Sequence, residues 1–197
     1  MPSDPHHLAS ADRCDAPGDP ATVVAWQPGW PERFAVLGAA LRAALGPVAI
    51  RIDHIGSTAV PGLAAKPIID VQVSVAALEP MDPFRIPLEH RGFRWRADNP
   101  DCTRRYFRES PGMIRTHIHV RRTGSFGEQF ALLFRDYLRA HPDEADSYAA
   151  LKRELAPLLR TDRPLYTDRK DPFIWDMMRL ASAWSQRTRW RPGPSDA

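Results

Sequence analysis

The sequence has few cysteines and no long apolar run. Its 197 residues contain only two cysteines, Cys14 and Cys102, which cannot form a disulfide framework, so we expect reduced thiols. No apolar stretch approaches the roughly 20 residues that span a membrane. The first 20 residues also lack the apolar core of a signal peptide. These absences predict a cytoplasmic protein with no membrane segment.

A strong charge of one sign is missing too. The formal net charge is +3, and no run of basic residues stands out, so nucleic acid is not an expected partner. Lysine is scarce, because only Lys66, Lys152 and Lys170 occur among 27 basic residues. Lysine supplies a compact point charge that arginine does not. The three lysines are therefore candidates for an anion site, although a coding bias and surface solvation explain their number equally well.

The composition divides the chain into three parts. Residues 1–20 are rich in Pro, Asp, Ser and Ala, which predicts a disordered leader, and His6–His7 is read as part of it rather than as a metal site. Residues 21–185 are predicted to form one domain, with an apolar fraction of 43% for the chain that is near the globular norm. Residues 186–197 are rich in Arg and Pro and are predicted to be a flexible tail.

One dense motif, residues 54–75, organises the chain. An alternating run at 48–54 predicts a strand, a small-residue turn follows at Gly56-Ser57-Thr58, and residues 67–75 predict a second strand. Glycine lets the backbone approach a phosphate closely, and serine donates a hydroxyl. Side chains alternate along a strand, so Asp70 and Gln72 share one face. The motif therefore predicts a phosphate-binding turn beside a strand-borne carboxylate.

Periodicity and turn residues predict the remaining elements. Pro31 opens a first helix that Gly46 ends. Ser125 and Glu128 form a capping box before an amphipathic helix, whose solvent side is expected to carry Arg135. The other predicted elements are a short helix at 84–91, a strand at 93–96, a hairpin of 104–109 and 114–121, a helix from 142 to about 157, and a last helix that starts between 167 and 172.

These residues resemble the GrpB family of the nucleotidyltransferase-like superfamily, from about Trp26 to Trp184. The matching motifs are His54-Ile55-Gly56-Ser57-Thr58, Pro61-Gly62, Lys66-Pro67-Ile68-Ile69-Asp70, Tyr148-x3-Lys152 and Tyr166-x3-Lys170. The resemblance implies an α+β fold, with a nucleotidyltransferase-like mixed β-sheet, flanking helices and a helical C-terminal portion. It also implies a nucleotide site beside the Gly-Ser turn, with the three lysines in the cleft.

The chain departs from the superfamily pattern at the metal-binding strand. The superfamily places two carboxylates there, one residue apart, for magnesium, and a further carboxylate on a neighbouring strand. This chain has Gln72 in place of the second carboxylate, and His117 and His119 stand where the further one would be sought. Asp70, His117 and His119 form a possible metal set that suits manganese, iron or zinc better than magnesium. The alternative is two histidines hydrogen-bonded in a polar cleft or binding phosphate.

We therefore expect Asp70, Gln72, His117 and His119 to line one cleft near Ser57. His54 is expected either to act as a base or to cap the turn, and Arg115 is a further anion candidate. The expected function is binding of a nucleoside triphosphate or related phosphate ligand, with Mg²⁺ or another divalent metal, and nucleotidyl transfer to a small molecule. The alternatives are a non-catalytic module for nucleotides or coenzyme A precursors, and a metal-dependent enzyme of other chemistry. The predicted site residues are Asp70, His117 and His119 for catalysis and metal binding, and Gly56, Ser57, Thr58, Lys66, Arg104, Lys152 and Lys170 for phosphate binding.

Overall fold

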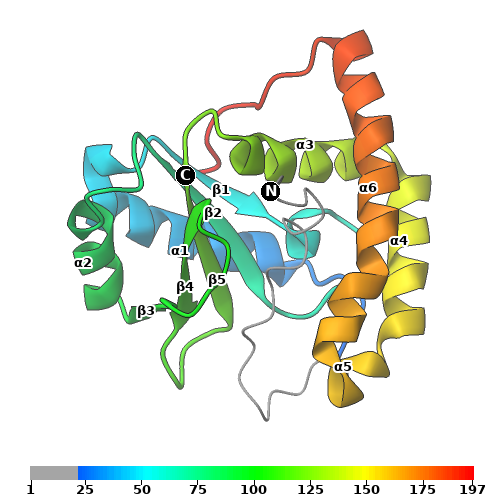
Figure 1. The fold of residues 1–197 in the computed structure, drawn as a ribbon, viewed down its shortest axis with the longest axis horizontal. Helices are drawn as coiled ribbons and strands as arrows, with labels where there is room; N and C mark the ends of the chain where they lie inside the picture. Colours follow the sequence, from blue (N-terminus) through cyan, green and yellow to red (C-terminus); the bar gives the residue numbers. More distant parts are fainter. Residues whose placement is uncertain (1–21) are drawn as a thin grey trace, which may run out of the picture.

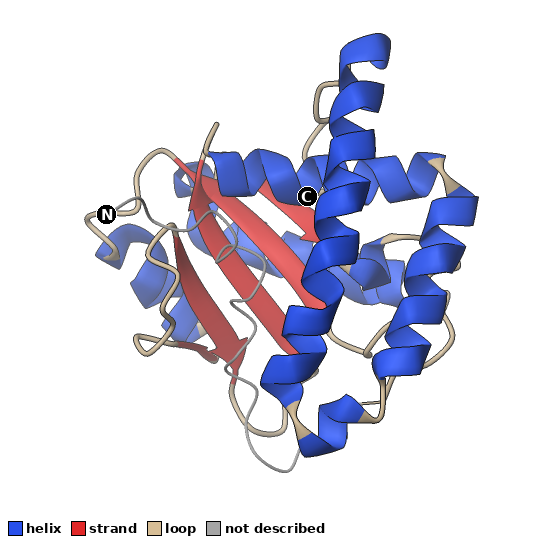
Figure 2. Ribbon diagram, turned by 45° about the vertical axis from the view of Figure 1, so that its right-hand side comes forward, coloured by secondary structure: helices blue, strands red, loops and turns tan. Residues whose placement is uncertain are grey.

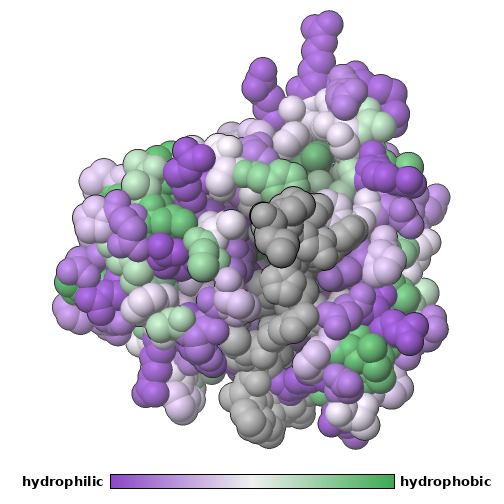
Figure 3. Space-filling view, in the orientation of Figure 1, coloured by the Kyte–Doolittle hydropathy of each residue, from purple (hydrophilic) through white to green (hydrophobic). Residues whose placement is uncertain are grey.

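The computed structural model describes residues 22–197. The predictions for residues 1–20, including Cys14 and the His6–His7 pair, lie outside the described residues. Within the described part of the chain, no helix is both long and apolar enough to cross a membrane. Hydrophilic residues cover most of the described surface in the view of Figure 3, and the apolar patches there are small and separate.

A five-stranded mixed sheet forms the centre of the molecule (Figure 2). Its spatial order is β1-β2-β5-β4-β3, in which β2 and β5 run parallel and the other neighbours are antiparallel. The predicted hairpin is therefore confirmed as β4 and β5. The strands are β1 (Arg51–Ile55), β2 (Ile69–Val75), β3 (Phe93–Trp95), β4 (Arg104–Glu109) and β5 (Thr116–Arg122).

Helices flank the sheet and make up the C-terminal portion (Figure 1). The helix α3 crosses the sheet, and α4 and α6 lie side by side beyond it. The predicted α+β architecture, with a mixed sheet, flanking helices and a helical C-terminal portion, is confirmed. The helices are α1 (Gly29–Leu45), α2 (Asp82–His90), α3 (Phe126–Ala140), α4 (Pro142–Leu155), α5 (Leu158–Thr161) and α6 (Arg163–Thr188), with two 3₁₀ turns, η2 (Gly46–Val48) and η3 (Ser57–Ala59).

Alternation along the strands gives the sheet one apolar and one polar face. On β2, the residues Ile69, Val71, Val73 and Val75 belong to a core cluster shared with α1 and α2. The alternate residues of β2 and their neighbours point the other way, because paired residues of adjacent strands share a face. We call this second surface the polar face. Its residues are Asp53, Asp70, Gln72, Ser74, Arg104, Tyr106, Arg108, His117, His119 and Arg121.

A second core attaches the C-terminal helices to the motif. Val60, Leu63 and Ala64, from the loop after η3, pack with buried residues of α3, α4 and α6 such as Tyr148 and Met177. The burial of this loop explains why its apolar residues follow no helix or strand period. It also places the Gly-Ser turn beside the inner side of α4.

The structure corrects the predicted face of α3. Arg135, expected on the solvent side, is only 3% exposed. Its Nη1 donates to the His54 carbonyl over 2.9 Å and to Asp196 Oδ2 over 2.7 Å. The helix packs on two sides, against the sheet and against α4 and α6, so a single apolar stripe does not describe it.

The last helix also differs from its predicted bounds. It begins at Arg163, earlier than expected, because the Asp162 side chain caps it by accepting from the Leu165 N–H over 2.9 Å. Pro164 is tolerated there because first-turn N–H groups have no helical partner. At the other end α6 continues to Thr188, inside the predicted tail.

The residues after α6 bind the open edge of β1. Ser195 Oγ accepts from the Ile52 N–H over 2.8 Å, and Asp196 Oδ2 accepts from the His54 N–H over 2.9 Å. An edge strand exposes unpaired backbone groups, and these contacts satisfy them. These contacts belong to residues 186–197, for which the flexibility expected from the Arg and Pro content stays a prediction.

Candidate functional site

Glycine is required at the start of the turn. Gly56 follows β1 with φ +69 and ψ −172, a conformation essentially restricted to glycine. A Cβ at this position would come within 2.6 Å of Asp70 Oδ2. The backbone of the turn therefore lies directly against the carboxylate of the next strand.

His54 supports the turn from the apolar side of the sheet. Its Nε2 lies 3.0 Å from Thr58 Oγ1, which donates to the Ile68 carbonyl over 3.1 Å. Its ring stacks on Phe34 with 4.7 Å between centroids. Burial lowers the pKa of His54 from 6.5 to about 4, so the ring is neutral near pH 7. His54 was expected either to act as a base or to cap the turn, and this geometry favours the cap.

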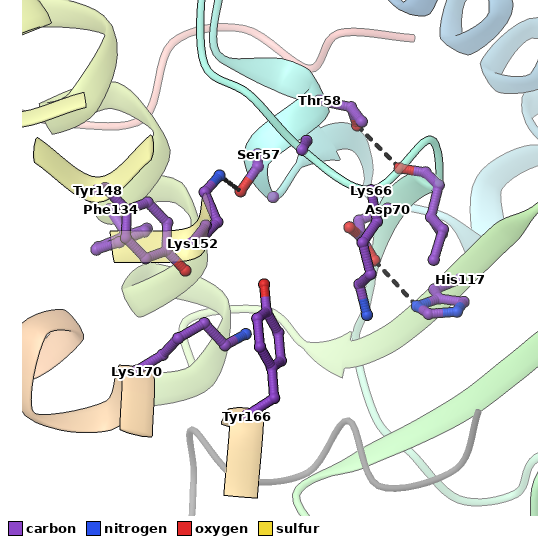
Figure 4. Close-up of a pocket in the computed structure, with 13 residues that line it drawn as sticks. Ser57, Thr58, Lys66, Asp70, His117, Phe134, Tyr148, Lys152, Tyr166 and Lys170 are labelled. Carbon is purple, nitrogen blue, oxygen red and sulfur yellow. Dashed lines mark hydrogen bonds and ion pairs between the residues drawn. The ribbon is translucent and has the colours of Figure 1, made fainter. Parts of the chain in front are cut away.

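Lys152 reaches the turn from α4. Its Nζ donates to Ser57 Oγ over 2.9 Å and also contacts the Ala64 carbonyl oxygen (Figure 4). The side chain is buried and lies over the Tyr148 ring, with 4.5 Å from Nζ to the centroid. Burial, and then the charge of Lys170, lower the pKa of Lys152 from 10.5 to about 6. Lys152 is thus largely uncharged near pH 7 in the ligand-free protein.

The other two lysines flank one tyrosine. The Nζ atoms of Lys66 and Lys170 lie 5.9 and 4.4 Å from the centroid of the Tyr166 ring. Both lysines and the ring line the same cavity as Ser57, a space of about 150 Å³ (Figure 4). The predicted site residues that line it are Gly56, Ser57, Thr58, Lys66, Asp70, His117, Lys152 and Lys170. We call this cavity the lysine pocket.

Asp70 and the two histidines meet on the polar face. Asp70 Oδ1 lies 3.3 Å from His117 Nδ1 and 3.5 Å from His119 Nε2. Removal from water would raise the pKa of the Asp70 carboxyl, but the hydrogen bonds that it accepts from His117 and His119 hold it below its ordinary value. One ligand atom from each residue lies within 4.8 Å of the others. This separation and the donor set could hold a divalent cation.

Arg104 constrains the use of His119 as a ligand. One Arg104 Nη atom contacts His119 Nδ1, and a guanidinium only donates. Nδ1 must therefore accept, which places the proton of the neutral ring on Nε2, the atom that faces Asp70. A metal-binding histidine usually donates from its second nitrogen instead. Asp70 and His117 thus fit a divalent cation, whereas His119 fits only if Arg104 moves away.

Gln72 does not line the lysine pocket. The prediction that it shares a cleft with Asp70 is therefore wrong. It is 0% exposed, and its amide nitrogen donates to the Glu128 carbonyl over 3.3 Å beneath α3. His119 does not line the lysine pocket either; it is 5% exposed, and its ring centroid lies 6.4 Å from that of His117. Arg115 lies away from the lysine pocket and lines a different cavity.

The structure adds an aromatic lining for which the sequence predicts no role. Phe134, Tyr148 and Tyr166 complete the lysine pocket, and Tyr148 and Tyr166 each stand four residues before a pocket lysine. Residues four apart share a helix face. This spacing was the available sequence signal for the two tyrosines, whereas nothing local distinguished Phe134.

The mixed sheet, with its glycine-serine turn and strand-borne carboxylate, defines an α+β protein with a basic pocket at one sheet face. A model of the "GrpB protein" family matches residues 20–180, and the chain belongs to this family. The chain is 42% identical over 168 residues to the UPF0157 protein PA4798 of Pseudomonas aeruginosa, covering 81% of this chain and 67% of that one.

Other relatives are longer than the matched region. The UPF0157 protein YqkA of Bacillus subtilis is 34% identical over 89% of this chain, and the dephospho-CoA kinase of Mycolicibacterium paratuberculosis is 34% identical over 95%. The chain spans about half the length of these relatives, 49% and 51% respectively.

Among solved structures, the GrpB protein from Enterococcus faecalis has a TM-score of 0.73 at 34% identity, over 83% of this chain and 99% of that one. The match confirms the predicted membership of the GrpB family.

Proposed function

We propose that the protein binds the phosphates of a nucleoside triphosphate or a related ligand in the lysine pocket. In this proposal Ser57 and the three lysines contact the phosphates, and the reaction is transfer of a nucleotidyl group to a small molecule. The observation that carries the proposal is Lys152, because a buried amine held on a serine beside two further lysines has a reason to be there if an anion binds.

The pocket chemistry agrees with this role. An anion beside Lys152 would favour its charged form and offset the cost of burial. Lys66 and Lys170 line the same cavity and are half-buried, unlike the buried Lys152, so they can contact further phosphate oxygens. The motif glycine brings the turn backbone close to Asp70, at the point where a metal and a phosphate would meet.

In the transfer, an acceptor hydroxyl oxygen bonds to the α-phosphorus while the bond from that phosphorus to the pyrophosphate oxygen breaks. His117 would accept the hydroxyl proton on Nε2, oriented by its Nδ1 contact with Asp70. While His117 acts as the base, Asp70 is the residue that would hold a divalent cation, which when bound neutralises developing charge on the phosphates. The acceptor is then positioned by the polar face.

A second candidate is a non-catalytic module for nucleotides or coenzyme A precursors. Two observations favour it: Gln72 is sealed beneath α3, and Arg104 opposes metal binding at His119. The similarity to proteins named dephospho-CoA kinase suggests the ligand class. In this reading, the pocket binds phosphate and no bond is broken.

Calorimetry with a panel of nucleoside triphosphates, dephospho-coenzyme A and pantetheine phosphate tests the binding. We expect at least one phosphate ligand to bind the parent, and Lys170→Ala to weaken it. Pyrophosphate release in the presence of Mn²⁺ or Mg²⁺ and a mixture of small hydroxyl compounds separates the two candidates, because only the transferase releases it. Stabilisation by Zn²⁺ or Mn²⁺ with no phosphate ligand bound would instead support a metal-dependent enzyme of other chemistry.

A further inference from the structure

Ser57 and Lys152 have the geometry of a nucleophile and its base. Lys152 Nζ lies 2.9 Å from Ser57 Oγ (Figure 4), which is hydrogen-bond reach between such groups. Both residues line the lysine pocket. Ser57 is half-buried, so a ligand in the pocket can reach its hydroxyl, whereas Lys152 is only 3% exposed. A serine hydroxyl is a weak nucleophile until an adjacent base takes its proton.

Lys152 can act as that base. Burial, and then the charge of Lys170, lower the pKa of Lys152 to about 6, so near pH 7 the amine is mainly neutral and carries a lone pair. The Ala64 carbonyl accepts an N–H of this amine and orients it. The lone pair can then accept the Ser57 hydroxyl proton over the same 2.9 Å. A serine, a neutral lysine and a group that orients the lysine make up a catalytic pair that occurs on unrelated folds.

The surroundings of Lys152 favour an uncharged substrate. Arg153, the next residue of α4, also lowers the pKa of Lys152, although less than Lys170 does. An anion in the pocket would favour the charged amine, which cannot accept a proton. The pair is therefore suited to a substrate without negative charge. The titratable groups that line the cavity around Lys152 are Lys66, Asp70, His117, Tyr148, Tyr166 and Lys170.

We propose that Ser57 and Lys152 form a nucleophile–base pair that hydrolyses a small uncharged ester or thioester through an acyl-serine. Ser57 Oγ bonds to the carbonyl carbon while Lys152 Nζ takes the hydroxyl proton. The bond to the alcohol or thiol then breaks, and Lys152 returns the proton to that leaving group. Water attacks the acyl-serine in the same way, and Ser57 Oγ recovers its proton from Lys152 as the carboxylic acid leaves.

The cavity limits the size of this substrate. Its volume of about 150 Å³ is below that of drug-sized ligand pockets, which begin near 300 Å³. The Phe134 and Tyr148 rings offer apolar contact to a short acyl group. This activity uses the same cavity as the proposed phosphate binding but does not rest on it.

Methanesulfonyl fluoride tests the pair, because it is small and uncharged and leaves a stable sulfonyl group on a serine nucleophile. Ser57 Oγ bonds to its sulfur, fluoride leaves, and Lys152 takes the proton. Peptide mass spectrometry should find the modification at Ser57 in the parent and not in Ser57→Ala. Lys152→Met should slow it about 100-fold or more. Ser147, an exposed serine of α4 that donates to the Asp143 carbonyl, is the internal control and should stay unmodified.

The pH dependence gives a readout that a purely structural role of Lys152 would not produce. The modification rate of the parent should rise with pH through about 6 and then level off, because the amine is neutral above its pKa. Lys170→Gln removes the second cause of the low pKa, so it should move this midpoint to higher pH. This profile tests the pair even if Lys152→Met fails to fold.

Several results would overturn the proposal. They are no modification of Ser57, modification of Lys152 in its place, labelling of Ser147 at an equal rate, an unchanged rate in folded Lys152→Met, and a rate that keeps rising with hydroxide without a plateau. p-Nitrophenyl acetate tests the substrate class, because it is a small uncharged ester. Its hydrolysis should be lost once Ser57 carries the sulfonyl group, and equal hydrolysis before and after modification would also overturn the proposal.

Tripolyphosphate separates this inference from the proposed function. If tripolyphosphate fails to bind but Ser57 is modified with the expected plateau, the nucleophile–base pair stands and the proposed phosphate site falls. If tripolyphosphate binds and Ser57 is not modified in the ligand-free protein, the proposed function stands and this inference is wrong.

Discussion

The two ends of the polar face differ although they belong to the same strands. At the open end, Asp70 lies against the Gly56 turn and lines the lysine pocket. At the buried end, one pair of residues further along, Gln72 faces Asp53 across β1 and β2, and both are 0% exposed. Glu128 of α3 closes this end from above, 1% exposed.

The difference shows how the same alternation yields a site at one end and structural packing at the other. Arg51 binds both Asp53 oxygens, over 2.7 and 3.0 Å, and burial nevertheless raises the pKa of Asp53. Asp53, Gln72 and Ser74 are each 0% exposed at the buried end, and Gln72 lines no cavity found among the described residues, so it does not act as a weakened substitute for a metal carboxylate. The proposed ligand binding is therefore expected at the open end.

The strongest test of this contrast introduces a carboxylate at the buried end. Gln72→Glu would place a charge beneath α3, beside the Glu128 carbonyl and opposite Asp53. We expect a loss of about 3 kcal/mol or more in the free energy of unfolding at pH 7, because the charge is buried without a partner. The loss should shrink as the pH falls and the carboxyl is protonated. Denaturant unfolding measures it, with Gln72→Met as the uncharged control.

This expectation reverses the one that the sequence suggests. If Gln72 were a degraded magnesium ligand, Gln72→Glu would be stabilised by Mg²⁺. A magnesium-dependent gain in its unfolding temperature, absent in Gln72→Met, would show that position 72 belongs to the open end after all.

The second test breaks the turn at the open end. Gly56→Ala should cost about 2–3 kcal/mol of unfolding free energy, because it combines a disfavoured φ with a close approach to Asp70 Oδ2. Gly62→Ala is the matched control, since Gly62 has φ +80 but nothing within 4 Å of an added Cβ. Its cost should be limited to about 1–2 kcal/mol of backbone strain. Equal losses in Gly56→Ala and Gly62→Ala would show that the close approach to Asp70 Oδ2 does not contribute to the cost at Gly56.

The third test concerns affinity. Ser57→Ala and Lys66→Ala should each weaken phosphate-ligand binding about tenfold, as expected when one hydrogen bond to a charged group is lost. Ser74→Ala, at the buried end of the same face, should leave the affinity unchanged. Calorimetry with the tightest ligand of the panel measures all three. Unchanged affinity in both open-end variants would exclude this pocket as the phosphate site.

The smallest expected effect concerns metal binding. Arg104→Gln offers a carbonyl to His119 Nδ1, which would let Nε2 turn its lone pair toward Asp70. We expect Zn²⁺ or Mn²⁺ to bind this variant more tightly than the parent, by up to about tenfold. The added stability with each metal, compared in thermal unfolding, measures it, and His117→Ala in the same background should abolish it. Equal metal responses in variant and parent would mean that Arg104 does not limit the site.

Local signals predicted the strands and the open end well. Strand parity placed Asp70, His117 and His119 on one face, and the motif placed Ser57 and the lysines nearby. Parity alone could not show which residues a helix would cover, so Gln72 was misplaced. The positions of Arg135 and of residues 195–197 depend on contacts between distant parts of the chain. Such contacts leave no periodic signal in the sequence, so they could not be predicted from it. Pro164 and Pro172 made the start of α6 hard to predict. Pro164 lies in the first turn, where a proline is compatible with a helix, and Pro172 lies inside the helix.

Proton uptake on phosphate binding is the decisive measurement of whether Lys152 becomes charged on an anion in the lysine pocket. Lys152, with a pKa of about 6, is mainly neutral above that pH, and a bound anion raises its pKa, so binding must take up a proton. Calorimetry of tripolyphosphate binding near pH 7.5, in two buffers of different ionisation enthalpy, should show close to one more proton taken up by the parent than by Lys152→Met. The parent's affinity should fall by up to about tenfold per pH unit above pH 6, until the pKa of the bound state is reached. Tight binding by Lys152→Met with the same proton uptake as the parent would contradict the account.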